Sequence, residues 1–239
     1  MPKLCIALDL PRDENLALCE NLAKNNIYNI YLKIGLRSFI RDGVDFIKDL
    51  ENLGFKIFLD LKLYDIPNTM LDSIREIMKL NVSMLTIHAS SGRVAMREIG
   101  KLIKQCENPP LIFAVSALTS FTNDDFVEIY NTPLDKAILN LAKIVNECGI
   151  DGIVCSPLES KSIKDKFDLL TLTPGIRPIK SDFNTAIDLY DNSDDQNRTS
   201  SIKMAESSDF IVIGRPIYKH KNPIFITKQI LSILDNKGC

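Results

Sequence analysis

The sequence has no marked excess of charge of either sign. Its 29 lysines and arginines are balanced by 31 aspartates and glutamates, which leaves a formal net charge of −2 over 239 residues. This balance provides no basic field that would attract nucleic acid, so we expect no nucleic-acid partner. Glycine and proline, at 10 and 11 residues, are too few for a fibrous or low-complexity protein.

Long hydrophobic runs are missing as well. No apolar stretch reaches the length needed to cross a bilayer, and residues 1–9 lead directly into an apolar run broken by an acid, which is not the pattern of a signal peptide. The six cysteines include no Cys-x-x-Cys pair and have no histidine nearby, so they fit reduced thiols better than disulfides or zinc. We therefore expect a cytoplasmic protein with no membrane partner.

Eight short apolar runs recur along the chain, and segments with the helical period of apolar residues separate them. We expect strands at the apolar runs because each is short and bounded by polar or turn residues. The predicted strands lie near Leu4–Leu10, Tyr28–Ile34, Phe55–Leu61, Val82–His88, Leu111–Ala117, Gly152–Cys155, Leu169–Thr173 and Phe210–Gly214.

Helical periodicity is clearest between the fifth and sixth strands. There, apolar residues recur at steps of four and three from Leu134 to Cys148, and Gly149 is well placed to end the helix. Similar spacing predicts a helix from Phe39 through Gly43 to Leu53, and a last helix over Ile224–Leu234.

Eight strand–helix units in 239 residues favour a closed parallel sheet. We predict a single (β/α)8 (TIM) barrel over residues 1–239, because no linker or change of composition indicates a second domain. No Gly-x-Gly-x-x-Gly follows the first strand, which argues against a dinucleotide-binding sheet. One long polar stretch, residues 188–201, separates strands seven and eight, and loops of that length are usually functional or disordered.

Charged residues stand at the C-terminal ends of the first three predicted strands. Residues two apart on a strand share a face, and these charges lie opposite the apolar face, so we expect all of them to point into the barrel, where active sites of this fold lie. Any one alone would suit an ordinary ion pair at the rim, but four together favour a catalytic cluster. The four are Asp9, Lys33, Asp60 and Lys62.

Alternating acids and bases keep such lysines charged, because each carboxylate favours the ammonium form of its neighbour. A charged lysine suits proton donation to a developing carbanion, whereas Schiff-base chemistry needs a neutral amine. Decarboxylation, aldol cleavage and enolisation all fit this pattern. Lysines placed among the carboxylates also argue against a metal site at this rim.

The loops after strands seven and eight are predicted to bind phosphate. They contain Thr173-Pro174-Gly175-Ile176-Arg177 and Gly214-Arg215-Pro216, and barrels of this kind often bind phosphate there through backbone N–H groups and a helix N-terminus. The glycines allow a close approach of the backbone, and the arginines offer charge-assisted hydrogen bonds. Either motif alone is common, so the prediction of phosphate binding rests on the presence of both.

The two histidines carry weaker signals. His88 ends the fourth strand and could face the site, although a lone histidine there is more often structural. His220 lies in a basic turn, and we expect it to be solvated. No Ser-His-Asp or Cys-His arrangement is evident.

The stretch Asp60-Leu-Lys62-Leu-Tyr-Asp65-Ile66-Pro-Asn-Thr69 resembles the Asp-x-Lys-x-x-Asp-Ile-Pro-Asn-Thr signature of bacterial orotidine 5′-monophosphate decarboxylases. The segment after Gln196 departs from the family pattern, because residues 197–201 lack its usual Lys-Arg and proline. Elsewhere the resemblance extends along the whole chain through Ala7-Leu8-Asp9, Lys33-Ile34-Gly35, His88-Ala89-Ser90, Leu118-Thr119-Ser120, Thr173–Arg177, Asp194-Asp195-Gln196 and Ile213–Pro216.

The resemblance implies decarboxylation of orotidine 5′-monophosphate to uridine 5′-monophosphate without metal or organic cofactor. Lys62 would protonate C6 of the pyrimidine, Asp60 would lie beside the departing carboxylate, and Lys33 would hold Asp60 and the ribose. Asp65 would complete this catalytic set from the other subunit of a homodimer. The other implied substrate contacts are Ile66 and Thr69 across the same interface, Asp9 at the ribose, Thr119 at the pyrimidine edge, Gln196 between ring and phosphate, and Pro174, Arg177, Gly214 and Arg215 at the phosphate.

Two alternatives remain. Metal-dependent sugar-phosphate decarboxylases and aldolases of the same barrel type resemble this chain in their Asp-x-Lys-x-x-Asp core but carry an acid at the position of Lys33. A barrel that binds a phosphate ligand without catalysis is the second alternative, and the presence of Asp60, Lys62 and Asp65 argues against it.

Overall fold

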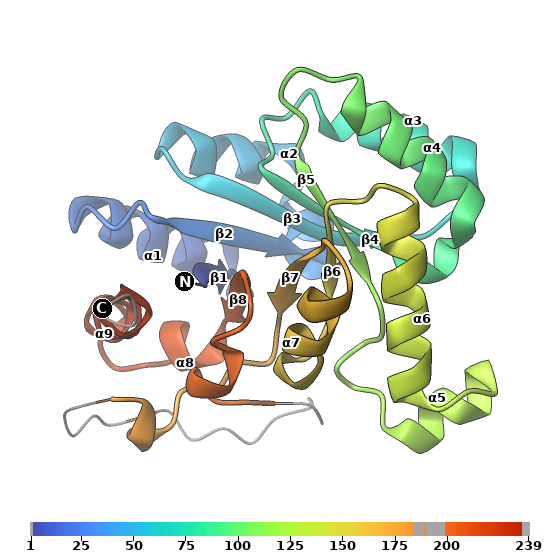
Figure 1. The fold of residues 1–239 in the computed structure, drawn as a ribbon. Coiled ribbons are helices and arrows are strands. Elements are labelled where there is room, and N and C mark those ends of the chain that lie inside the picture. The colour runs from blue at the N-terminus through green and yellow to red at the C-terminus, as the bar shows by residue number, and fades with distance from the viewer. Residues whose placement is uncertain (1, 184–188, 190–198, 236–239) are drawn as a thin grey trace.

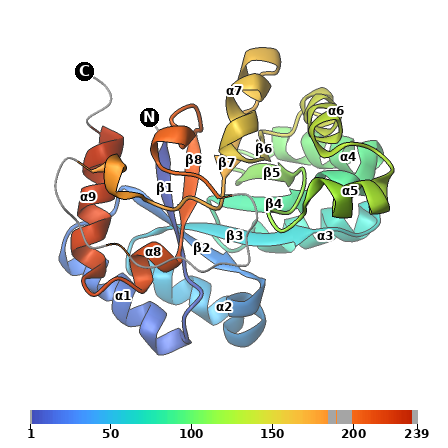
Figure 2. The ribbon, with the colours of Figure 1, turned by 90° about the horizontal axis from the view of Figure 1, so that it is seen from below.

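The computed structural model describes residues 2–183, 189 and 199–235. Within these residues, eight strands form one closed barrel in chain order, β1 to β8, in which neighbouring strands are parallel and β1 pairs with β8 (Figure 1). Seen from another direction, the helices surround the strands (Figure 2). The predicted (β/α)8 barrel is therefore confirmed.

Each predicted strand is present, although its ends differ. β1 ends at Ala7 rather than Leu10, and β5 ends at Val115 rather than Ala117, so the residues just beyond belong to loops over the barrel mouth. The strands are β1 (Lys3–Ala7), β2 (Ile30–Gly35), β3 (Lys56–Leu63), β4 (Met84–His88), β5 (Leu111–Val115), β6 (Gly152–Val154), β7 (Leu170–Thr173) and β8 (Phe210–Ile213).

Among the described residues, an α-helix follows every strand except β7, which is followed by the short 3-10 helices Lys180–Asp182 and Lys203–Ala205. The described α-helices are α1 (Arg12–Lys24), α2 (Leu36–Asn52), α3 (Pro67–Ile77), α4 (Gly92–Lys104), α5 (Asn123–Tyr130), α6 (Leu134–Glu147), α7 (Pro157–Lys166), α8 (Arg215–Tyr218) and α9 (Pro223–Asp235). The predicted helix from Leu134 is α6, and Gly149 follows its end with a φ of 72°. The short helix α5 was not predicted. It begins with a capping box between Thr122 and Asp125.

The predicted helix through Gly43 is present as α2, but it is kinked. Gly43 has a φ of 63° and a ψ of −155°, so α2 consists of two helical parts joined at this residue. Glycine adopts a positive φ without a steric penalty, whereas the apolar period on either side carries no signal of the break.

The core has two parts, one between the strands and the helices and one inside the barrel. In the inner part, the rings of Tyr31 and Phe113 each contact the ring of Phe210 edge to face, with 5.5 Å between ring centroids. These rings fill the barrel toward the N-terminal ends of the strands. Nearer the C-terminal strand ends, the inward residues are smaller, which leaves space for a cavity at that end. These smaller residues include Ala7, Val115, Val154 and Val212.

Replacing Gly100 with alanine is expected to destabilise the protein, although glycine-to-alanine changes inside helices normally stabilise them by about 1 kcal/mol. A Cβ at Gly100 would lie 2.2 Å from the backbone oxygen of Cys148, where α4 packs against the end of α6. We expect the free energy of unfolding to fall by about 2 kcal/mol or more. Lys101→Ala, at an exposed position of the same helix, should change it by less than about 0.5 kcal/mol in the same urea titration. Equal stability of the Gly100→Ala variant and the parent would contradict this packing.

The described part of the chain contains no helix that is long and apolar enough to cross a membrane. The described cysteines form no disulfide with one another, and Cys5 and Cys19 are fully buried. Burial raises the pKa of the Cys19 thiol to about 12, so this thiol is chemically quiet at neutral pH.

Candidate active site

A cavity of about 330 Å³ opens at the C-terminal end of the barrel. Its size lies within the range of sites for small molecules. The predicted acids and bases of β1 to β3 lie on one side of it, and Arg177 and Arg215 from the β7 and β8 side also line it. The sequence-predicted charged cluster and the predicted phosphate residues therefore share one cavity.

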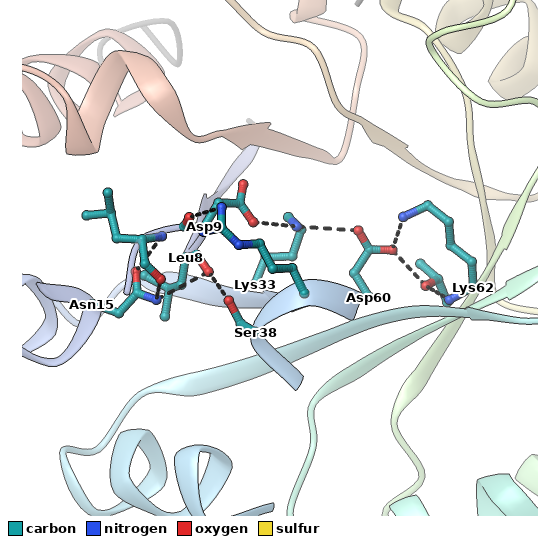
Figure 3. A network of polar contacts seen from close by, with 10 residues as sticks. Leu8, Asp9, Asn15, Lys33, Ser38, Asp60 and Lys62 are labelled. Carbon is teal, nitrogen blue, oxygen red and sulfur yellow. Dashed lines mark hydrogen bonds and ion pairs between the residues drawn. The ribbon is translucent and has the colours of Figure 1, made fainter. Parts of the chain in front are cut away.

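The charged residues form a row of alternating sign (Figure 3). Lys33 lies between two carboxylates, with its Nζ 4.0 Å from Asp9 Oδ1 and 3.5 Å from Asp60 Oδ2. Lys62 Nζ donates to Asp60 Oδ1 at 2.8 Å. The side chains of Lys33 and Asp60 are about nine-tenths buried, so the centre of the row is largely removed from water.

The backbone at Lys62 has an unusual conformation. Its φ is 51°, and the other non-glycine residues with positive φ among those described are asparagines, which tolerate this region better. A lysine in this conformation costs of order 1–3 kcal/mol, and such strain gathers at functional sites. The side chain nevertheless points to the same side as Asp60, as the strand alternation predicted.

Asp60 is held in its charged form by its neighbours. Burial alone would raise its pKa, but the positive charges of Lys33 and Lys62 and hydrogen bonds from Lys62 and Thr86 act in the opposite direction, and the net pKa lies below the usual value. Asp60 is therefore an anion at neutral pH in this cavity.

Asp9 lies beyond the end of β1, yet its segment is anchored (Figure 3). The backbone oxygen of Leu8 accepts a hydrogen bond from Ser38 Oγ at 2.7 Å, and the oxygen of Leu10 accepts one from Asn15 Nδ2 at 2.8 Å. Ser38 and Asn15 are fully buried. Together with the hydrogen bond from Leu8 N–H to Lys33 O at 3.0 Å, these bonds fix the loop that carries Asp9.

The loop that carries Arg177 is fixed in the same way. Gly175 has a φ of 79°, which glycine alone adopts freely, and Ile176 forms a parallel bridge with Ser200. Arg177 N–H donates to Ser200 O at 2.8 Å, and Ser200 N–H donates to Gly175 O at 3.1 Å. The buried carboxylate of Asp182 accepts backbone N–H groups on both sides of this bridge.

Gly214 lies where the backbone comes close to the cavity wall. A Cβ there would lie 3.2 Å from the Cβ of Ala7 and 3.3 Å from the ring of Tyr218. Glycine therefore leaves the entry to α8 open to the cavity, next to Arg215.

Three residues predicted for the site do not line the cavity of their own chain. Asp65, Ile66 and Thr69 are exposed at the end of β3 and the start of α3, and the Asp65 carboxylate accepts only a local hydrogen bond, from Ile66 N–H at 2.7 Å, among those described. Of the other predicted residues, Thr119 and Pro174 line the cavity, whereas Gln196 lies outside the described residues.

A family model described as orotidine 5′-phosphate decarboxylase / HUMPS family matches residues 2–230. The chain belongs to this family. The predicted resemblance is confirmed.

Relatives of the chain carry matching names. A protein of Sulfurimonas denitrificans named orotidine 5′-phosphate decarboxylase is 48% identical over 236 residues, which cover 96% of this chain and 98% of that protein. A protein of the same name from Nautilia profundicola is 46% identical and covers 96% of this chain and 97% of its own length. The crystal structure of orotidine 5′-phosphate decarboxylase from Lactobacillus acidophilus superimposes with a TM-score of 0.79 at 31% identity and covers 98% of this chain and all of that one.

His88 and His220 differ in their surroundings in this member of the family. His88 stacks on Tyr64, and its pKa is lowered by burial and by the charge of Lys62. The prediction that His220 is solvated is wrong, because its ring is buried and its Nδ1 accepts the backbone N–H of Asn222 at 2.9 Å. Its basic neighbours in the sequence suggested exposure, but the turn folds the ring inward.

Thr86 and Tyr218 line the cavity but were not predicted. Thr86 carried a signal, because it precedes His88 by two residues on β4 and so shares its face. Tyr218 follows the predicted Gly-Arg-Pro motif on α8, where strand alternation gives no guidance. Among the residues that the structure describes, no three His, Cys, Asp or Glu side chains gather as metal ligands would.

Proposed function

We propose that this chain decarboxylates orotidine 5′-monophosphate to uridine 5′-monophosphate, the last step of de novo pyrimidine nucleotide synthesis, with Lys62 as the proton donor and residues 1–239 acting as one catalytic domain. The family assignment confirms the predicted enzyme class, a carboxy-lyase. The observation that carries the residue assignments is the contact of 2.8 Å between Lys62 Nζ and Asp60 in a cavity that Arg177 and Arg215 also line.

In the proposed reaction, the bond between C6 of the pyrimidine and its carboxylate breaks and carbon dioxide leaves. The electron pair remains on C6, which takes a proton from Lys62 Nζ. Because the ammonium is already held by Asp60, little reorganisation is needed as negative charge develops on C6. Lys33, on the other side of Asp60, keeps that carboxylate in place and reaches toward the ribose.

The remaining substrate contacts are proposed from the family resemblance, and those of them that the structure describes line the cavity. Arg177, Gly214 and Arg215, with Pro174 beside them, bind the phosphate. Binding at the phosphate, far from C6, supplies energy that can act in the transition state. The other contacts are Asp9 with the ribose, Thr119 with the pyrimidine edge, and Gln196, outside the described residues, between ring and phosphate.

The active form is proposed to be a homodimer in which Asp65, Ile66 and Thr69 reach the site of the other subunit. These residues are exposed and lie outside the cavity of their own chain. Other exposed apolar side chains lie in the segments that follow β2, β3 and β4, which is typical of an interface. These side chains are Leu36, Ile40, Tyr64 and Val94.

No metal or organic cofactor is assigned to the reaction, and the location is proposed to be cytoplasmic. Carbanion stabilisation is assigned to the ammonium of Lys62, which performs the task that a divalent cation performs in a metal-dependent relative. Lys33 occupies the position where such a relative would carry an acid.

Turnover without metal is the direct test. The purified chain in excess chelator should consume orotidine 5′-monophosphate, measured as loss of its ultraviolet absorbance, at the same rate as with added magnesium. Loss of activity in chelator would favour the metal-dependent sugar-phosphate enzymes. Binding of uridine 5′-monophosphate without any turnover would favour a barrel that only binds phosphate ligands.

A further inference from the structure

Thr86 lies opposite an irregularity in β3. Leu59 pairs with Leu85 and Leu63 pairs with Ile87, so the three residues 60–62 of β3 face Thr86 alone. This is a bulge, which interrupts the ladder of backbone hydrogen bonds between the two strands. The bulged residues include both Asp60 and Lys62.

The hydroxyl of Thr86 replaces the missing ladder contacts. Its Oγ1 accepts the backbone N–H of Lys62 at 2.9 Å and donates to Asp60 Oδ1 at 2.8 Å. The same Asp60 oxygen accepts a hydrogen bond from the ammonium of Lys62 at 2.8 Å. Thr86 is fully buried, so bulk water does not reach it. One hydroxyl group therefore joins the backbone of Lys62 to the carboxylate that holds the Lys62 side chain.

We propose that Thr86 is a positioning residue for the decarboxylation, and that its hydroxyl fixes the Lys62 ammonium by holding the Lys62 backbone and the Asp60 carboxylate together. The inference rests on the proposed function. The backbone of Lys62 has a left-handed conformation, which is unfavourable for a residue with a side chain. Without the hydroxyl, the Lys62 N–H loses its acceptor and Asp60 loses a donor, so both groups move. A displacement of about 1 Å at a reacting group can cost about 10²-fold in rate.

Replacing Thr86 with valine tests this role, because valine keeps the shape and removes the hydroxyl. We expect kcat for orotidine 5′-monophosphate to fall by about 10²-fold. KM and the affinity for uridine 5′-monophosphate should stay within about threefold of the parent, because the Thr86 hydroxyl bonds Lys62 and Asp60, whereas phosphate binding is assigned to Arg177 and Arg215. Thr86→Ser, which restores a hydroxyl, should recover kcat to within about tenfold of the parent.

Thr171 provides a matched control. It is a fully buried threonine on β7 whose hydroxyl also joins a carboxylate and a backbone N–H, those of Asp209. Thr171→Val should lower the melting temperature by an amount similar to that of Thr86→Val, since each leaves buried polar groups without a partner. It should leave kcat within about twofold of the parent, because it lies outside the cavity.

The outcomes separate this inference from the proposed function. No turnover by the parent would contradict the proposed function itself. An active parent with a folded Thr86→Val variant of unchanged kcat, or equal loss of kcat in Thr171→Val, would overturn the positioning role. If the valine variant does not fold, Thr86→Ala supplies the same comparison: a lower kcat with unchanged product affinity supports the role, and an unchanged kcat overturns it.

Discussion

Replacing Lys62 with alanine is expected to abolish decarboxylation almost completely while the variant still binds uridine 5′-monophosphate. The change removes the proposed proton donor and with it the positive charge beside the developing carbanion, so the loss in kcat should reach about 10⁴-fold or more. Product affinity should be kept because Arg177 and Arg215, the residues proposed to bind the phosphate, line another part of the cavity wall. The fold should also be kept, since Asp60 retains Lys33 at 3.5 Å.

The measurement combines single-turnover absorbance with calorimetric titration of uridine 5′-monophosphate. Lys56→Ala is the matched control, because Lys56 lies at the other end of β3, exposed, with its ammonium over the ring of Tyr31. That variant should turn over like the parent. A Lys62→Ala variant with turnover within about tenfold of the parent would assign proton donation to another group.

The barrel could be predicted because strand alternation and helical period are both direct consequences of burial. Residues such as Ile6 and Cys5 alternate between the outer and inner parts of the core as predicted from their neighbours in the sequence. The same alternation correctly predicts that the Asp60 side chain points into the barrel. The face of the sheet on which a side chain lies is therefore decided largely by its position in its own strand.

Other features of the structure could not be predicted from the sequence, because they depend on backbone conformations that the pattern of apolar and polar residues does not indicate. The bulge at Lys62 leaves the side-chain alternation intact, so the sequence gives no sign of its positive φ. The break at Gly43 is similar, because the apolar period continues across it. Thr86 became important only when the bulge placed it alone opposite three residues of β3.

The proposed contribution of Asp65 to the site of a second subunit is the part of the assignment that needs more than one chain. Asp65 lies on the rim between the exposed side chains of Tyr64 and Ile66, outside the cavity that holds Lys62. Two exposed apolar residues beside a carboxylate favour a position at an interface, where the carboxylate would enter the site of the other subunit. The resemblance to the family assigns the same role to Asp65.

Mixing Lys62→Ala chains with Asp65→Ala chains is therefore expected to restore activity that neither variant has alone. In a mixed dimer, the site that keeps Lys62 receives Asp65 from the other subunit and is complete, whereas the second site lacks both. Random pairing makes half of the dimers mixed, so activity should recover to about a quarter of the parent value. Mixing Lys62→Ala chains with chains that carry both changes supplies no Lys62 and should recover nothing. Absence of recovery in the first mixture, with subunit exchange verified by mass, would place the action of Asp65 within its own chain.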